Sequence, residues 1–137
     1  MEAIALSAPI SKKGLWAGRI LSGLVVVFLL MDSVMKVMLS SVAVEGTKKV
    51  GYPEGTVFPL GCVLLACTLL YAIPRTSILG AILLTGYLGG AVATHVRVGD
   101  PLFSHVLFPV YFGVMLWGGL YLRESRLRAL IPLRNQP

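Results

Sequence analysis

Four apolar runs separated by short polar connections constrain this chain more than any other feature. The runs cover residues 15–39, 57–73, 78–96 and 105–122. Each approaches or exceeds the stretch of roughly 20 apolar residues with which a helix crosses a bilayer. Hydrophobic residues make up 56% of the chain and charged residues only 13%, whereas a soluble domain carries about 25% charged residues. We therefore predict an all-α fold, a membrane-embedded bundle of four helices that forms one domain over residues 1–137.

Local signals at the ends of the runs support four helices. Pro59 suits the first turn of the second helix, because the N–H that proline lacks is unpaired there anyway. Pro74 ends the same run, and Thr76 or Ser77 can cap the third helix. Pro109 lies early in the fourth run, where we expect it to kink the helix.

The connection over residues 40–55 is the only long one between the runs. Gly46, Gly51 and Pro53 argue against one continuous helix through it. We expect a short helix and a turn that fold back on the outer surface.

Basic residues are distributed unequally between the two ends of the predicted bundle. The first and third connections hold Lys48, Lys49 and Arg97. Because cytoplasmic flanks of membrane spans collect Lys and Arg, and an even number of spans brings both termini together, we expect both termini in the cytoplasm of a multi-pass protein of the cytoplasmic membrane. The formal charge of +6 is explained by these flanks and implies no nucleic-acid partner. The eight basic residues of the terminal side are Lys12, Lys13, Arg19, Arg75, Arg123, Arg126, Arg128 and Arg134.

The basic tail, residues 123–137, has two interpretations. Its Arg and Leu residues at helical spacing fit a short interfacial helix on anionic headgroups. A solvated flank that follows the positive-inside rule is the simpler interpretation and the one we favour.

Two ionisable residues, Asp32 and Lys36, interrupt the first apolar run. They are four residues apart, so a helix places them one turn apart on one face, with the acid before the base as ion pairs prefer. Charge at bilayer depth costs a few kcal/mol or more, so such residues usually face a protein interior or a water-filled cavity and have a partner. A clasp that fixes helix register and a working site both fit this pair. Lys36 alone can also extend to the outer headgroups.

Other ionisable residues are expected at the same depth. With the termini inside, the third span runs outward to His95 and Arg97, and the fourth begins at His105. Tyr87 shares the helix face of His95, and Tyr52 can cover the site from the long connection. We therefore predict one outward-opening polar cavity, with these ligand-binding residues: Asp32, Lys36, Tyr52, Tyr87, His95, Arg97 and His105.

Small residues repeat at four-residue spacing along the third run. Gly86, Gly90 and Thr94 form a stripe that lets helix backbones approach closely. We interpret the stripe as a packing surface rather than a ligand site, and it favours a homodimer through these three residues.

The cysteines and histidines give no sign of redox or metal chemistry. Cys62 and Cys67 are five apart, so they face different sides of a helix and form no Cys-x-x-Cys motif. The chain has two histidines, and we predict no metal site.

Short motifs follow one another in a fixed order along the chain: Lys36 at the end of the first run, Gly51–Tyr52–Pro53, Leu60–Gly61, Pro74, and Gly89–Gly90–Ala91–Val92–Ala93–Thr94–His95. In their order and spacing they resemble the DoxX-like family of membrane proteins, whose name comes from a subunit of an archaeal thiosulfate:quinone oxidoreductase. The likeness covers about residues 20–130. It implies a four-helix bundle and an association with a membrane redox complex, and it makes quinone the cofactor to consider.

Two functions follow from these observations. In the first, the protein binds a small hydrophobic or lipid-like ligand, or a partner enzyme, through the polar cavity in the outer leaflet. In the second, it is an intramembrane enzyme that performs proton chemistry on a membrane-soluble substrate. The catalytic candidates are then Asp32 as acid or base, Lys36 to set its charge, and His95 to relay a proton or bind.

Overall fold

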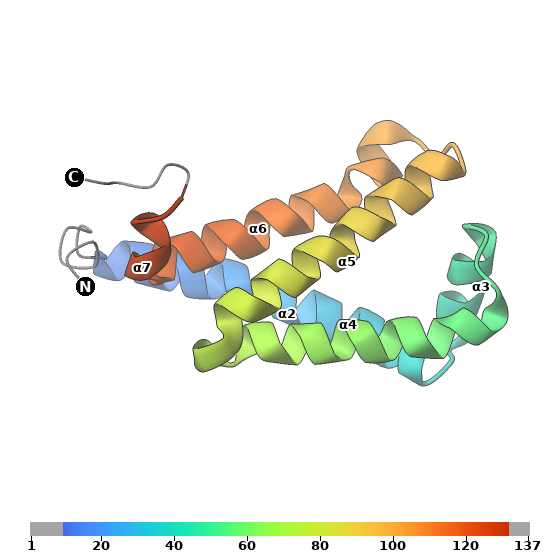
Figure 1. The fold of residues 1–137 in the computed structure, drawn as a ribbon, viewed down its shortest axis with the longest axis horizontal. Helices are drawn as coiled ribbons and strands as arrows, with labels where there is room; N and C mark the ends of the chain where they lie inside the picture. Colours follow the sequence, from blue (N-terminus) through green and yellow to red (C-terminus); the bar gives the residue numbers. More distant parts are fainter. Residues whose placement is uncertain (1–9, 132–137) are drawn as a thin grey trace.

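The computed structural model describes residues 10–131, and every regular element in that part of the chain is helical (Figure 1). Four elements are long and apolar enough to cross a membrane. This confirms the predicted all-α bundle, and the boundaries of the four helices lie within three residues of the predicted ones. The long helices are α2 (Lys12–Val37), α4 (Val57–Ala72), α5 (Ser77–Arg97) and α6 (Phe108–Arg123). The short elements are α3 (Ser41–Lys49), α7 (Ser125–Arg128), the 3₁₀ turns Glu54–Thr56 and Pro74–Thr76, and the π turn Leu102–Val106.

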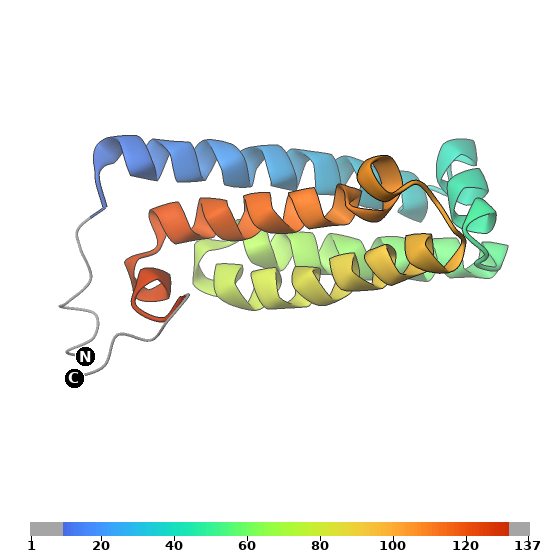
Figure 2. The same cartoon turned by 90° about the horizontal axis from the view of Figure 1, so that it is seen from above.

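Successive long helices run antiparallel, in the order α2–α4–α5–α6 around the bundle (Figure 2). Helices α2 and α5 are diagonal neighbours, and each packs against both α4 and α6. The closed end holds the start of α2, the turn between α4 and α5, and α7. The open end holds α3 and the connection between α5 and α6, and there α5 diverges from α4 (Figure 1).

Glycines allow the closest helix approaches at the closed end. A Cβ atom on Gly18 of α2 would lie 2.7 Å from the carbonyl oxygen of Gly119 of α6. A Cβ atom on Gly80 of α5 would overlap the backbone of Tyr71 of α4. Backbone contacts of this kind supply the dispersion energy that holds helices together where the surroundings are themselves apolar.

A chain of side-chain hydrogen bonds joins three helices at the same end. Arg123 Nε donates to Ser22 Oγ (3.0 Å), and Tyr71 Oη donates to the carbonyl oxygen of Leu116 (2.7 Å). Since the single proton of Tyr71 is used there, the 2.9 Å contact between Ser22 and Tyr71 runs from the serine hydroxyl to the phenol oxygen. Tyr71 is fully buried. This series of hydrogen bonds therefore fixes α2, α4 and α6 relative to one another.

Two local predictions were wrong. Thr76 and Ser77 do not cap α5 with their side chains; their hydroxyls donate to the carbonyls of Leu70 and Tyr71 at the end of α4 (2.7 and 2.8 Å). Those carbonyls have no hydrogen-bond donor within their own helix, so the two hydroxyls satisfy acceptors that would otherwise be unpaired. Pro109 does not kink a continuous fourth helix, because it lies in the first turn of α6, which begins after a separate π turn.

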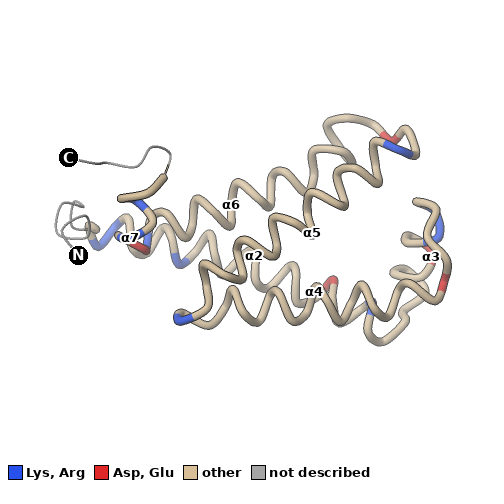
Figure 3. The backbone as a smooth tube through the Cα atoms, in the orientation of Figure 1, with Lys and Arg blue, Asp and Glu red and all other residues tan. Residues whose placement is uncertain are grey.

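The tail folds back at the closed end, where Lys and Arg residues are concentrated (Figure 3). Arg128 of α7 donates from Nε to the carbonyl oxygen of Tyr121 (2.8 Å), and its guanidinium lies over the Tyr121 ring. Helix α7 has four residues. Residues 132–137 of the predicted tail, including Arg134, lie outside the described residues.

We expect Tyr71→Phe to lower the free energy of unfolding by about 1–2 kcal/mol, because it removes the hydroxyl that donates to the Leu116 carbonyl and accepts from Ser22, and so breaks the hydrogen-bond chain from Arg123. Reversible unfolding in mixed micelles, followed by circular dichroism, measures the change. Tyr121→Phe is the matched control, since no hydrogen bond of the Tyr121 hydroxyl occurs within residues 10–131. Equal stability of both variants would contradict a structural role for this series of hydrogen bonds.

Candidate functional site

A cavity of about 470 Å³ lies inside the open end of the bundle. Its walls come from α2, α3, α5 and α6, with smaller contributions from Leu60 of α4 and from Val50 and Tyr52 of the connection that follows α3. The cavity exists because α5 diverges from α4 at this end while α3 crosses it (Figure 1). It is the feature of the described chain in which most of the predicted site residues meet.

Aromatic rings form one wall of the cavity. Phe28 of α2 stacks on Phe112 of α6 with ring centroids 4.4 Å apart, and Phe108 meets both edge-on at 5.8 and 5.1 Å. All three rings line the cavity. This wall offers an apolar surface to whatever occupies the space.

Asp32 and Lys36 line the same cavity as an ion pair. Lys36 Nζ donates to Asp32 Oδ2 at 2.6 Å, with the two residues one turn apart on α2 as the sequence predicted. The Lys36 side chain is 14% exposed and that of Asp32 36%, so the carboxylate is the more accessible partner. A Cβ atom on Gly61 of α4 would lie 2.7 Å from Lys36 Cβ. The close crossing of α4 therefore holds the backbone that carries the pair.

Three similar turns close the helices of the open end. In each, the residue after the helix cap has a positive φ: Leu39 (54°), Gly51 (96°) and Gly99 (75°). The next N–H bonds the carbonyl five residues back, as in Met35–Ser40, Thr47–Tyr52 and His95–Asp100. This is the Schellman geometry, in which a left-handed residue reverses the chain at a helix end. Leucine adopts that conformation at a cost of roughly 1–2 kcal/mol, so the turn into α3 is strained.

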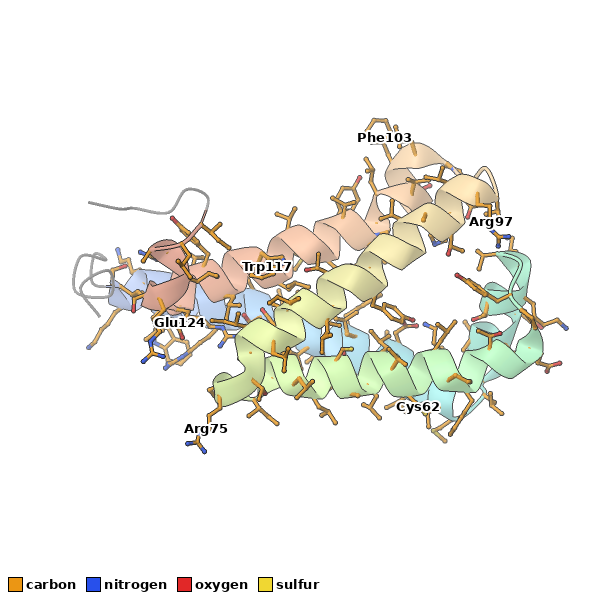
Figure 4. The ribbon with its side chains drawn as sticks, in the orientation of Figure 1. Cys62, Arg75, Arg97, Phe103, Trp117 and Glu124 are labelled. Carbon is orange, nitrogen blue, oxygen red and sulfur yellow. The ribbon has the colours of Figure 1, made fainter. Side chains whose placement is uncertain are left out.

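The second turn delivers Tyr52 across the cavity to α5. Tyr52 Oη lies 2.9 Å from Thr94 Oγ1. Thr94 donates its own hydroxyl proton to the Gly90 carbonyl (2.8 Å), so Tyr52 is the donor in the bond between the two hydroxyls. Arg97 at the end of α5 donates to the Val50 carbonyl (3.0 Å), and Figure 4 shows its side chain reaching toward this segment. These two bonds tie the α3 region to α5.

The third turn pairs His95 with Asp100. His95 Nδ1 and Asp100 Oδ2 are 2.6 Å apart, which fixes the ring and leaves Nε2 for another partner. The His105 ring lies edge-on at 5.9 Å, and its Nδ1 contacts Ser104 Oγ at 2.8 Å. Only His95 of the two histidines lines the cavity.

The small-residue stripe of α5 lies along the cavity. Gly86, Gly90 and Thr94 line the cavity, and a Cβ atom on either glycine would have no neighbour within 4 Å. Because α5 diverges from α4 here, the two glycines of the stripe do not pack closely against another helix of the bundle. The homodimer through these residues stays a prediction.

The structure brings together five of the seven predicted ligand-binding residues: Asp32, Lys36, Tyr52, Tyr87 and His95 line the cavity. The other two lie beside it, with Arg97 bound to Val50 and His105 behind His95. Ligand binding by these seven residues stays a prediction.

Sequence reasoning missed the aromatic wall and the partner of His95. The Gly99–Asp100 pair after a helix end is the signal that could have identified this partner, because a Schellman turn returns the second residue toward the last helical turn. The two cysteines behave as predicted, with Cys67 buried and Cys62 exposed on the outside of α4 (Figure 4).

We expect Lys36→Met to destabilise the protein by about 1–3 kcal/mol, because it leaves the Asp32 carboxylate unpaired in an apolar site. The double variant Asp32→Leu/Lys36→Met removes both charges and is expected to recover most of that loss. Thermal unfolding of the purified variants measures both changes. A double variant less stable than the single one would show that the pair contributes more than mutual charge compensation.

Comparison with protein families identifies one match. The DoxX-like family matches residues 20–119, a range that contains every residue lining the cavity. No curated protein and no solved structure matches the chain.

Proposed function

The chain belongs to the DoxX-like family of membrane proteins, and on that premise we propose that its cavity binds a small amphipathic molecule within the membrane. The observation that carries the proposal is the two-sided lining of the cavity. Phe28, Phe108 and Phe112 supply an apolar wall, whereas Asp32 and Lys36 supply a polar one. Ligand sites typically combine an apolar surface with a few converging polar groups that fix orientation.

The dimensions of the cavity agree with this use. Its volume of about 470 Å³ lies within the range of roughly 300–1,000 Å³ that small-molecule sites occupy. Gly86 and Gly90 leave space along the α5 wall, because neither carries a side chain and a Cβ atom on either would have no neighbour within 4 Å. Filling such a space with a ligand also recovers the dispersion contacts that an empty cavity forgoes.

We further propose that the open end lies in the outer leaflet and that both termini are cytoplasmic. Within the described residues, Lys12, Lys13, Arg19 and Arg75 belong to the closed end together with the three arginines of residues 123–128. The connections at the open end carry Lys48, Lys49 and Arg97. The bias toward the closed end supports this orientation in the cytoplasmic membrane. A ligand then enters from the outer leaflet.

Fusions to the C-terminus test the orientation. We expect a fused green fluorescent protein to fluoresce and a fused alkaline phosphatase to be inactive in a bacterial host, because the first folds in the cytoplasm and the second requires export. Fusions placed after residue 99 serve as the opposite control. An active phosphatase at the C-terminus would reverse the proposed orientation.

The family resemblance also supports a narrower proposal, an accessory role in a membrane redox complex with quinone as the bound molecule. The aromatic wall is compatible with a quinone ring. Docking of a partner enzyme through the open end is a related proposal. Both require the same occupied cavity, so the binding experiment comes first.

A second candidate function is proton chemistry on a membrane-soluble substrate, with Asp32, Lys36 and His95 as the participating residues. The His95–Asp100 contact favours it, because a carboxylate on Nδ1 orients the ring of this cavity-lining residue and leaves Nε2 to act as an acid or base. Turnover that is lost in both His95→Gln and Asp100→Asn, with ligand binding retained, is the expected sign of this function.

We expect Gly90→Leu to abolish ligand binding, because its side chain extends from the α5 wall into the cavity, where a Cβ atom has no neighbour within 4 Å. Gly89→Leu is the matched control. Gly89 is the adjacent residue, has equally open surroundings, and does not line the cavity. Mass spectrometry of lipids and small molecules that copurify with each variant measures the difference. Identical copurifying molecules in both variants would contradict the proposal.

A further inference from the structure

We propose that the cavity selects an uncharged, hydrogen-bonding head group on a single apolar chain, such as an alcohol or an amide, and rejects charged head groups. The inference rests on the proposed ligand-binding function. It adds the chemical class of the ligand, which the charge balance and the size of the cavity determine together.

The charges that line the cavity already cancel. Asp32 and Lys36 are the carboxylate and the ammonium in its lining, and they pair at 2.6 Å. His95 is paired with Asp100, and Arg97 is bonded to a backbone carbonyl outside the lining. An anionic or cationic head group would therefore add an uncompensated charge. Such a charge costs several kcal/mol in an apolar site.

The unused hydrogen-bonding capacity suits a neutral polar group. Lys36 has three N–H donors, and Asp32 takes one of them. The other oxygen of Asp32 and the hydroxyl of Tyr87 have no hydrogen bond to any residue between 10 and 131. The cavity thus offers donors and an acceptor at once. A hydroxyl or amide group can use both kinds, whereas a carboxylate only accepts and an ammonium only donates.

The volume of the cavity limits the size of the apolar part of the ligand. At about 30 Å³ for each water-sized group, the 470 Å³ of the cavity hold on the order of 16 non-hydrogen atoms. A single medium-length chain with a small head fits against the aromatic wall, whereas an intact two-chain phospholipid does not. The ligand is therefore a single-chain neutral amphiphile.

Three probes with the same chain and different heads test the inference: 1-dodecanol, dodecanoate and protonated dodecylamine. Each is added to the purified full-length protein in detergent, and the bound fraction is measured by native mass spectrometry. The variants are Asp32→Asn, Lys36→Gln and the double variant. Comparing variants for each probe cancels the different partitioning of the probes into detergent.

We expect the wild type to retain dodecanol. Asp32→Asn leaves the Lys36 charge uncompensated, so the dodecanoate-to-dodecanol ratio should rise at least tenfold. Lys36→Gln leaves the Asp32 charge, and the dodecylamine-to-dodecanol ratio should rise similarly. The double variant is neutral again and should return to dodecanol, which keeps the test valid if a single variant folds poorly. Gly90→Leu should bind none of the probes.

Each contrary result has a separate meaning. Wild-type protein that prefers a charged probe would overturn the head-group inference and leave the proposed binding function intact. Unchanged preferences in all charge variants would place the head group away from the pair and also overturn the inference. If none of the three probes binds to the wild type, or if Gly90→Leu binds them equally well, the result would contradict the binding function itself.

Discussion

The hydrogen-bond chain from Arg123 through Ser22 and Tyr71 to the Leu116 carbonyl is the interaction on which the architecture depends. It lies at the closed end, where Gly18 and Gly119 bring α2 and α6 into backbone contact. Helices of nearly constant diameter that are held tightly at one end can diverge only at the other. The cavity at the open end is thus a geometric consequence of close packing at the closed end.

At the open end, turns position the chain in addition to the close crossing of α2 and α4 at Gly61. Three Schellman turns reverse the chain there, and each positions the part of the chain that follows it. These parts are α3 after Leu39, Tyr52 after Gly51, and Asp100 after Gly99. Glycine adopts the left-handed conformation at little cost, but Leu39 does not. The bonds from Tyr52 to Thr94 and from Arg97 to Val50 then hold the α3 region against α5.

Charge within the cavity is present but internally balanced. A lone Asp32 or Lys36 at this depth would be costly, whereas the pair costs less and still presents polar atoms to the interior. The same balance explains how an apolar bundle retains a polar site. In the head-group selection that we propose, it also connects the stability of α2 with the charge of the bound molecule.

The sequence by itself determined the number, type and limits of the long helices, because the length of an apolar run and its flanking prolines act locally. It also determined the Asp32–Lys36 pair, since four-residue spacing on one helix fixes that contact. Only the tertiary structure decided that Gly86 and Gly90 line a cavity, because a stripe of small residues suits close packing and open space equally well. It likewise decided that Phe28 and Phe112 form a wall and that Arg97 and His105 lie outside it. Those outcomes depend on the angle between helices, which is set by contacts at the far end of the bundle.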